Sequence, residues 1–264
     1  MNYDKKISIT GYANLKSSQF IGFDKIEVEN KTFYYVSDFS NGNIVQFNDN
    51  WQYLVYRCIS VFQFSTYIIY YLYHFRPLAS ATFIKTINDQ LYISGYNGIY
   101  NLDTNMNYIK QYSLVSAYYN GIYYNKSSEK IYVASNRLNR IDVFNTSLEI
   151  LRSISTSVNV VGLNGYLNSV YAGTASGQIL IIQNETLTFR TFPKICSSNN
   201  VASITIDTVG FMYISCQNEN MLKMFHINGA NTGISLSTSG SLFQTSMDSK
   251  GRMIICGATF DIFY

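Results

Sequence analysis

The sequence predicts an all-β protein, a six-bladed β-propeller made of four-stranded antiparallel blades. The chain of 264 residues contains 24 Tyr, 17 Phe and only 2 Pro, a composition that favours strands over helices and supplies a sizeable apolar core. A short unit recurs six times, mostly at intervals of 39–42 residues. Around each copy, apolar and polar residues alternate in short runs, which is the pattern of half-buried strands.

The repeated unit has an aromatic or aliphatic pair, a small-residue turn and an alternating apolar strand. Its clearest copy is YVASNRLNRIDVF, at residues 132–144, and the other copies begin at Tyr35, Tyr92, Tyr171, Tyr213 and Ile254. Four short strands fit into each interval of about 40 residues, and such a sheet cannot bury both of its faces alone. Consecutive sheets are therefore expected to pack against one another as blades of a ring.

The two ends of the chain predict how this ring closes. The last unit stops at Tyr264 after its third strand, and residues 5–12 (KKISITGY) match the pattern of an outer strand. We expect residues 5–12 to complete the sixth blade as its fourth strand, which would leave no open sheet edge. Residues 1–264 then form a single domain.

The third unit resembles the NHL repeat, whose units read YVAD-x-x-N-x-R-I-x-V-F and assemble into six-bladed propellers. The resemblance is best at residues 132–144 and weaker in the units that begin at Tyr35 and Tyr213. Ser135 and Cys216 replace the usual acidic residue of the motif, which Asp38 retains. The resemblance therefore implies the fold, but the function of the family does not transfer with it.

The first interval between units is 57 residues, and its surplus lies in residues 58–76. We interpret this segment as an insertion between the first two blades. It could be a surface hairpin or loop, or the translation of an unspliced short intron. A membrane span is not favoured, since it would interrupt the ring after one blade.

The charge limits the partners that the sequence predicts, and the cysteine spacing predicts the state of the thiols. A formal charge of +3, scattered along the chain, does not favour nucleic-acid binding. The first residues lack the apolar core of a signal peptide, and the cellular compartment stays open. The four cysteines form no C-x-x-C pair, so we expect buried free thiols.

In propellers, the binding and catalytic residues lie at the ends of the central channel, on the loops that lead into each inner strand. An alignment based on the turn after each inner strand puts Asp24, Asn120 and Asn159 at comparable positions facing the channel. Asn200 lies close by, and Lys85 lies slightly deeper. This polar ring could bind a ligand, but with a single carboxylate it does not predict a metal site.

These observations favour a non-catalytic, monomeric scaffold that binds a protein, peptide or glycan through one face of the ring. We expect no catalytic residues and no cofactor, because no acid–base pair converges at the inner strands. The alternative is a metal-dependent hydrolase or lactonase of the six-bladed propeller type. Tyr118, Tyr119 and Tyr123 could form a contact patch, or they could belong to the core and ordinary surface.

Overall fold

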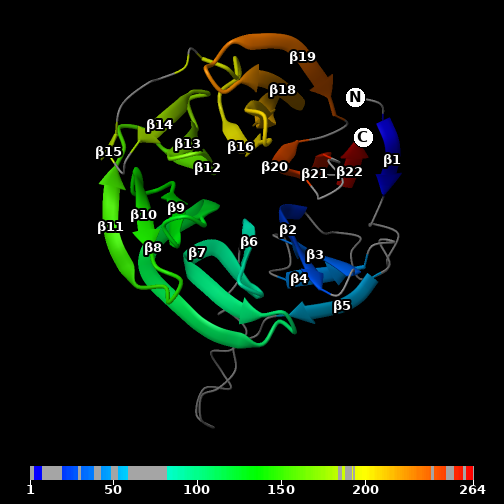
Figure 1. Ribbon diagram of the computed structural model, residues 1–264, viewed down its shortest axis with the longest axis vertical. Helices are drawn as coiled ribbons and strands as arrows, with labels where there is room; N and C mark the ends of the chain where they lie inside the picture. The colour runs from blue at the N-terminus through cyan, green and yellow to red at the C-terminus, as the bar shows by residue number, and fades with distance from the viewer. Residues whose placement is uncertain are drawn as a thin grey trace.

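Antiparallel sheets surround a central channel in the computed structural model of the chain (Figure 1). The structure describes residues 3–7, 20–28, 31–38, 43–48, 53–58, 82–183, 186–187, 192, 194–238, 241–247, 253–257 and 260–263. These residues form five sheets, and each sheet runs from an inner strand near the channel to an outer strand at the rim. The fold is an all-β propeller.

Four of the sheets in the described residues have four strands each. The first contains β2 (Phe20–Val28), β3 (Lys31–Asp38), β4 (Asn43–Phe47) and β5 (Tyr53–Cys58). Two later sheets contain β12 (Val160–Tyr166), β13 (Ser169–Thr174), β14 (Ile179–Gln183) and β15 (Thr186–Leu187), and then β16 (Val201–Ile206), β17 (Phe211–Cys216), β18 (Met221–His226) and β19 (Asn231–Ser237). A short 3₁₀ helix, η3 (Gln217–Glu219), follows β17.

The fourth of these sheets joins the two ends of the chain. It contains β20 (Leu242–Met247), β21 (Met253–Gly257) and β22 (Phe260–Phe263), and its outer strand is β1 (Tyr3–Ile7). β1 pairs with β22 in antiparallel register, from Tyr3 opposite Phe263 to Ile7 opposite Phe260. Residues 8–12, which we expected in the same strand, lie outside the described residues.

The remaining sheet differs from the expected blades, because its six strands are continuous. It contains β6 (Ile84–Ile87), β7 (Gln90–Asp103), β8 (Tyr108–Asn125), β9 (Lys130–Ser135), β10 (Arg140–Phe144) and β11 (Ile150–Ser155). β7 pairs with β6 near its start and with β8 from Tyr96 onward, while β8 pairs with β9 from Tyr119 onward. Positive φ angles at Asn97 and Ser116 mark where these long strands turn. Two repeat units have thus merged into one sheet.

The apolar core lies between neighbouring sheets. One buried cluster joins Ile141 and Val143 of β10 to Leu163 of β12 and Leu180 of β14. Buried residues of successive strands alternate toward the two neighbouring sheets, as the sequence periodicity predicts. Burial of these side chains is what holds one sheet against the next.

A buried carboxylate explains the Arg-Ile-Asp part of the clearest repeat. Asp142 is fully buried and accepts hydrogen bonds from Tyr119 Oη (2.7 Å) and Ser153 Oγ (2.5 Å). Arg140 Nε lies 2.9 Å from Asp142 Oδ1. Burial and the hydrogen bond to Asp142 raise the pKa of Tyr119. Tyr119 therefore belongs to the core and not to a contact patch.

The proposed insertion at residues 58–76 lies outside the described residues beyond Cys58. Among the residues that the structure does describe, no helix has the length and apolar character needed to cross a membrane.

Deleting residues 1–12 should lower the melting temperature of the whole domain. Without β1, the backbone of β22 loses its outer partner and the sheet becomes open at its edge. Thermal unfolding followed by circular dichroism measures this effect. A truncated protein that melts at the wild-type temperature would show that β1 contributes nothing to the fold.

Candidate functional site

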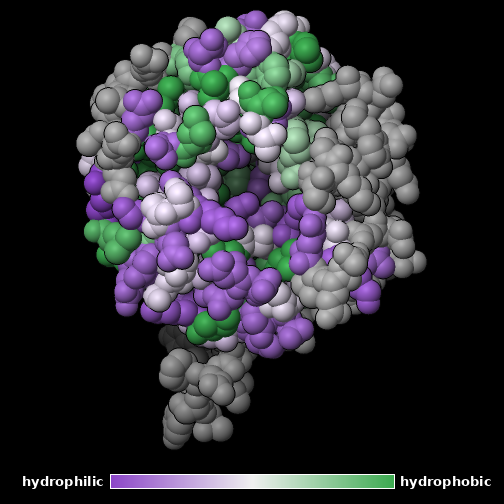
Figure 2. Space-filling view, viewed as in Figure 1, coloured by the Kyte–Doolittle hydropathy of each residue, from purple (hydrophilic) through white to green (hydrophobic). Residues whose placement is uncertain are grey.

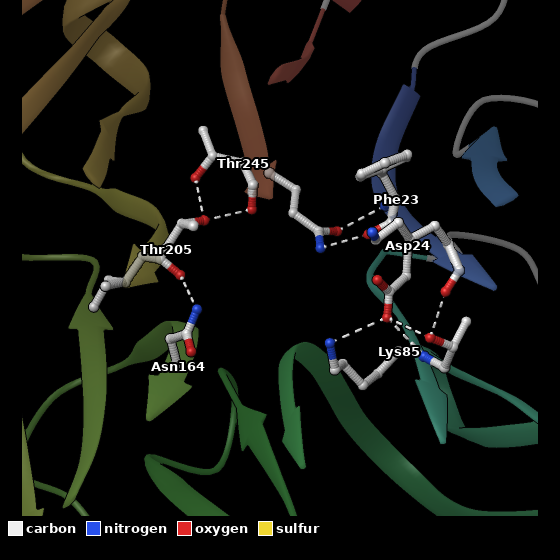
Figure 3. A network of polar contacts seen from close by, with 10 residues as sticks. Phe23, Asp24, Lys85, Asn164, Thr205 and Thr245 are labelled. Atoms are coloured by element: carbon white, nitrogen blue, oxygen red, sulfur yellow. Dashed lines mark hydrogen bonds and ion pairs between the residues drawn. The ribbon is translucent and has the colours of Figure 1, made fainter. Parts of the chain in front are cut away.

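Side chains of the inner strands bond to the backbone of the next inner strand around the channel (Figure 3). Asn164 Nδ2 of β12 donates to the Ile204 carbonyl of β16 at 2.9 Å. Thr205 Oγ1 of β16 donates to the Thr245 carbonyl of β20 at 2.7 Å. Neighbouring sheets share no strand ladder at the channel, so these bonds set the spacing of the inner strands.

The same arrangement continues between β20 and β2 and between β2 and β6. Gln244 accepts from the Phe23 N–H and donates to the Phe23 carbonyl, both at 2.8 Å. Asp24 Oδ2 accepts from the backbone N–H of Thr86 at 2.7 Å and lies 3.2 Å from Lys85 Nζ. Figure 3 shows Asp24 and Lys85 facing each other across this junction.

One end of the channel opens into a cavity of about 440 Å³, which we call the mouth. Its walls are the first residues of the inner strands and the residues that follow the second strands. The lining residues are Ile21, Thr82, Phe83, Tyr118, Asn120, Asn136, Asn159, Val161, Ala175, Asn200, Ala202, Gln217 and Phe243. Among these described residues the polar groups are mostly carboxamides, and none is charged. Figure 2 shows hydrophilic residues gathered below the hollow at the centre of the face in view.

The five residues selected from the sequence fall into two groups. Asn120, Asn159 and Asn200 line the mouth together. Asp24 and Lys85 instead line a smaller cavity of about 60 Å³, which we call the lower cavity, formed by residues further along the inner strands. Asp24 therefore does not share a level with Asn120, as the alignment had placed it. Phe83 lines both cavities, so the mouth and the lower cavity adjoin.

Two further carboxamides of the mouth, Asn136 and Gln217, were missed by the sequence analysis. Each directly follows the small tetrapeptide of its repeat unit, YVAS or YISC. That shared position was the available signal. The acid of the NHL motif stands one residue earlier, at Ser135 and Cys216 in these units.

Asn200 is held rigidly at the mouth. Its N–H donates to the Ala175 carbonyl at 3.0 Å, its own carbonyl accepts from the Gln217 N–H at 3.3 Å, and its Nδ2 donates to Gln217 Oε1. Asn200 Oδ1 is buried and has no hydrogen-bond partner. A buried acceptor without a partner costs about 1–3 kcal/mol.

The expectation of buried free thiols is wrong for two of the four cysteines. Cys196 and Cys216 form a disulfide that ties the loop before Asn200 to the end of β17. Their separation of 20 residues carries no motif that would have identified the pair. Cys256 is free and buried, and burial raises the pKa of its thiol.

A metal site is not supported within the described part of the chain. There, the group that could supply three ligands is Cys196, Cys216 and Glu219, but its two sulfurs are bonded to each other. The Glu219 carboxylate is also occupied, because it accepts from Ser198 N–H at 3.0 Å and lies 2.6 Å from Lys223 Nζ.

Comparison with known proteins finds similarity in structure alone. No protein-family model and no curated protein matches the sequence, so the resemblance to the NHL repeat is not confirmed. Among solved structures, a selenomethionine-substituted virginiamycin B lyase from Staphylococcus aureus is similar over 100% of both chains, with a TM-score of 0.69 and 11% identity. A streptogramin B lyase is similar over 93% of both chains, with a TM-score of 0.65 and 10% identity. At such low identity the similarity shows the propeller fold.

This finding corrects the interpretation as a non-catalytic scaffold. That interpretation assumed that a propeller without an evident acid–base set in its sequence serves only to bind. Both similar structures are lyases, which are enzymes, and they share the fold over nearly the whole chain. The scaffold interpretation is therefore set aside.

Replacing Gln244 with Ala should destabilise the fold by about 1–3 kcal/mol, because the Phe23 N–H and carbonyl both lose their partner. Urea unfolding measures the change, with Gln111→Ala on β8 as the matched control. Equal midpoints for the two variants would mean that the bridge between β20 and β2 is not a structural bond.

Removing the disulfide with the double substitution Cys196→Ser and Cys216→Ser should lower the free energy of unfolding by about 3 kcal/mol, as expected for closing a loop of this length. Unfolding with and without a reducing agent provides the measurement. The reductant should shift the wild type and leave the double variant unchanged. A wild-type curve insensitive to full reduction would contradict the assignment.

Proposed function

We propose that this protein is an enzyme, of the lyase class, that acts on a small amide-bearing molecule held in the mouth of the central channel. The observation that carries the proposal is the ring of carboxamides around the mouth, in which the Asn200 Oδ1 acceptor is buried and unpartnered. The similarity to virginiamycin B lyase and streptogramin B lyase supports the reaction class.

The chemistry of the mouth suits peptide groups. A carboxamide offers both donors and an acceptor, so it pairs with the N–H and carbonyl of an amide in either direction. Asn120 lies in β8, and Asn159 and Asn200 directly precede β12 and β16, so the three would contact one ligand from several sides. Ile21 and Phe243 add apolar surface between the amides, as small-molecule sites commonly do.

Proton transfer is assigned to Asp24 and Lys85. They are the charged residues among the described residues that line either cavity, and they lie beside the mouth across Phe83. A lyase breaks a bond by elimination, in which a base removes a proton and an acid protonates the departing atom. The Asp24 carboxylate would accept the proton and the Lys85 ammonium would supply one, so the pair carries the same total number of protons before and after the step.

The metal-dependent hydrolase or lactonase is the competing reaction class. Elimination yields products whose combined mass equals that of the substrate, whereas hydrolysis adds one water. Mass spectrometry of the products therefore separates the two classes.

The finer architecture is also part of this proposal. We propose six blades, because β2, β6, β8, β12, β16 and β20 each line the lower cavity and each contacts the next around the channel. Two of the blades share the six-stranded sheet, and β1 closes the ring on β22. Residues 58–76 would then be an insertion between the first two blades.

Turnover of virginiamycin B, followed by liquid chromatography and mass spectrometry, tests the proposal. We expect the wild type to form products whose combined mass equals that of the substrate. Asp24→Asn should lower kcat by at least about a hundredfold, which is the range that general acid–base groups contribute. The asparagine keeps an oxygen for the Thr86 N–H, so the fold should be retained.

The variant Asn120→Ala/Asn159→Ala/Asn200→Ala is the second arm and should raise KM more than it lowers kcat, because these residues are proposed to bind and not to react. Asp89→Asn, which changes an exposed carboxylate on the turn between β6 and β7, serves as the control for removal of one carboxylate. Wild-type kinetics in both Asp24→Asn and the triple variant, or products that have gained water, would contradict the proposal.

A further inference from the structure

Arg137 lies beside the mouth, on the turn that joins β9 to β10. The residue before it, Asn136, lines the mouth. The position is exposed, and a long charged side chain there would ordinarily extend into solvent. The contacts of Arg137 instead fix it to the aromatic residues of the neighbouring unit.

Two tyrosines connect the guanidinium to the mouth. Arg137 Nη1 donates to Tyr96 Oη at 3.2 Å, and Arg137 Cζ lies 5.0 Å from the centre of the Tyr96 ring. The Tyr96 ring lies 6.2 Å from the ring of Tyr118, which lines the mouth. Arg137, Tyr96 and Tyr118 thus form a continuous group, which we call the rim cluster.

The guanidinium keeps most of its hydrogen-bonding capacity. Arginine has five N–H donors, and in the described part of the chain Arg137 uses one of them on Tyr96 and pairs with no carboxylate. Glu219, a carboxylate on the η3 side of the mouth, is already paired with Lys223. The charge of Arg137 is therefore available to a ligand.

The rim cluster also has the electrostatic character of an anion site. Burial raises the pKa of Tyr118, while the Arg137 guanidinium partly offsets that effect. The phenol accordingly remains neutral near pH 7 and can donate its proton in a hydrogen bond. The mouth itself carries no charged lining among its described residues, so no carboxylate there competes for Arg137.

We propose that Arg137 gives the mouth a preference for amide-bearing molecules that carry a free carboxylate, such as an N-acylated amino acid or a peptide with a free carboxyl end. A single planar guanidinium matches the two oxygens of a carboxylate in a bidentate pair. Tyr96 holds the guanidinium in place, which reduces the entropy lost when the ligand binds. This inference rests on the proposed function, because it uses the same mouth.

Binding of two matched probes, N-acetyltyrosine and N-acetyltyrosinamide, tests the inference by titration calorimetry or ligand-observed NMR. They differ only in the carboxylate that Arg137 would bind. We expect the wild type to bind the carboxylate probe about tenfold more tightly, as a charge-assisted pair worth about 1.4 kcal/mol would give. Arg137→Gln should abolish that preference and leave the affinity for the amide probe unchanged.

Lys126→Gln is the matched control, since Lys126 is an exposed cation on the turn at the other end of β8 and β9. It should keep the tenfold preference. Equal affinity of the wild type for both probes, with the amide probe lost in the triple asparagine variant, would overturn the role of Arg137 and leave the mouth site standing. No binding of either probe to the wild type would overturn both.

Discussion

Contacts between inner strands of neighbouring sheets are the constraint on which this fold and its channel depend. Within a sheet, strands are held by regular backbone ladders, but one sheet meets the next at the channel without such a ladder. Ser37 bridges this gap, because its Oγ accepts from Gly22 N–H at 2.7 Å and donates to the Thr82 carbonyl of the next sheet at 3.0 Å. Gly162 permits the same approach elsewhere, since a Cβ there would lie 2.7 Å from Ser203 Cα.

The channel acquires its polarity from this requirement. The side chains of Gln244 and Asp24 are polar because they form hydrogen bonds with the backbone of the neighbouring sheet. Their polar groups consequently lie around the channel. Where the strands begin, the carboxamides have fewer backbone partners, and the Asn200 acceptor has none. Toward the mouth, the polar side chains therefore contribute less to holding the sheets together, and more of their hydrogen-bonding groups are available to a ligand. A propeller can change its ligand at this end without losing the contacts that hold the sheets together.

The repeat predicted the propeller because alternation and a period of about 40 residues depend on local sequence. The site was predicted only in part. Asn120, Asn159 and Asn200 were placed together, but Asp24 was placed too near the mouth because inner strands of unequal length were aligned from the turns that follow them. β2 continues four residues beyond Asp24, whereas β12 continues seven beyond Asn159. The disulfide and the rim cluster join residues far apart in sequence, so no local pattern could reveal them.

A crystal structure of the protein soaked with N-acetyltyrosine tests the central claim most directly, which is that the mouth of the channel is where this propeller binds its ligand. The account predicts electron density for the probe between Tyr118, Asn159 and Asn200, with an amide N–H of the probe within hydrogen-bonding distance of Asn200 Oδ1. Density confined to the outer groove beside Lys194 and Ile234, with the mouth occupied by water alone, would contradict it.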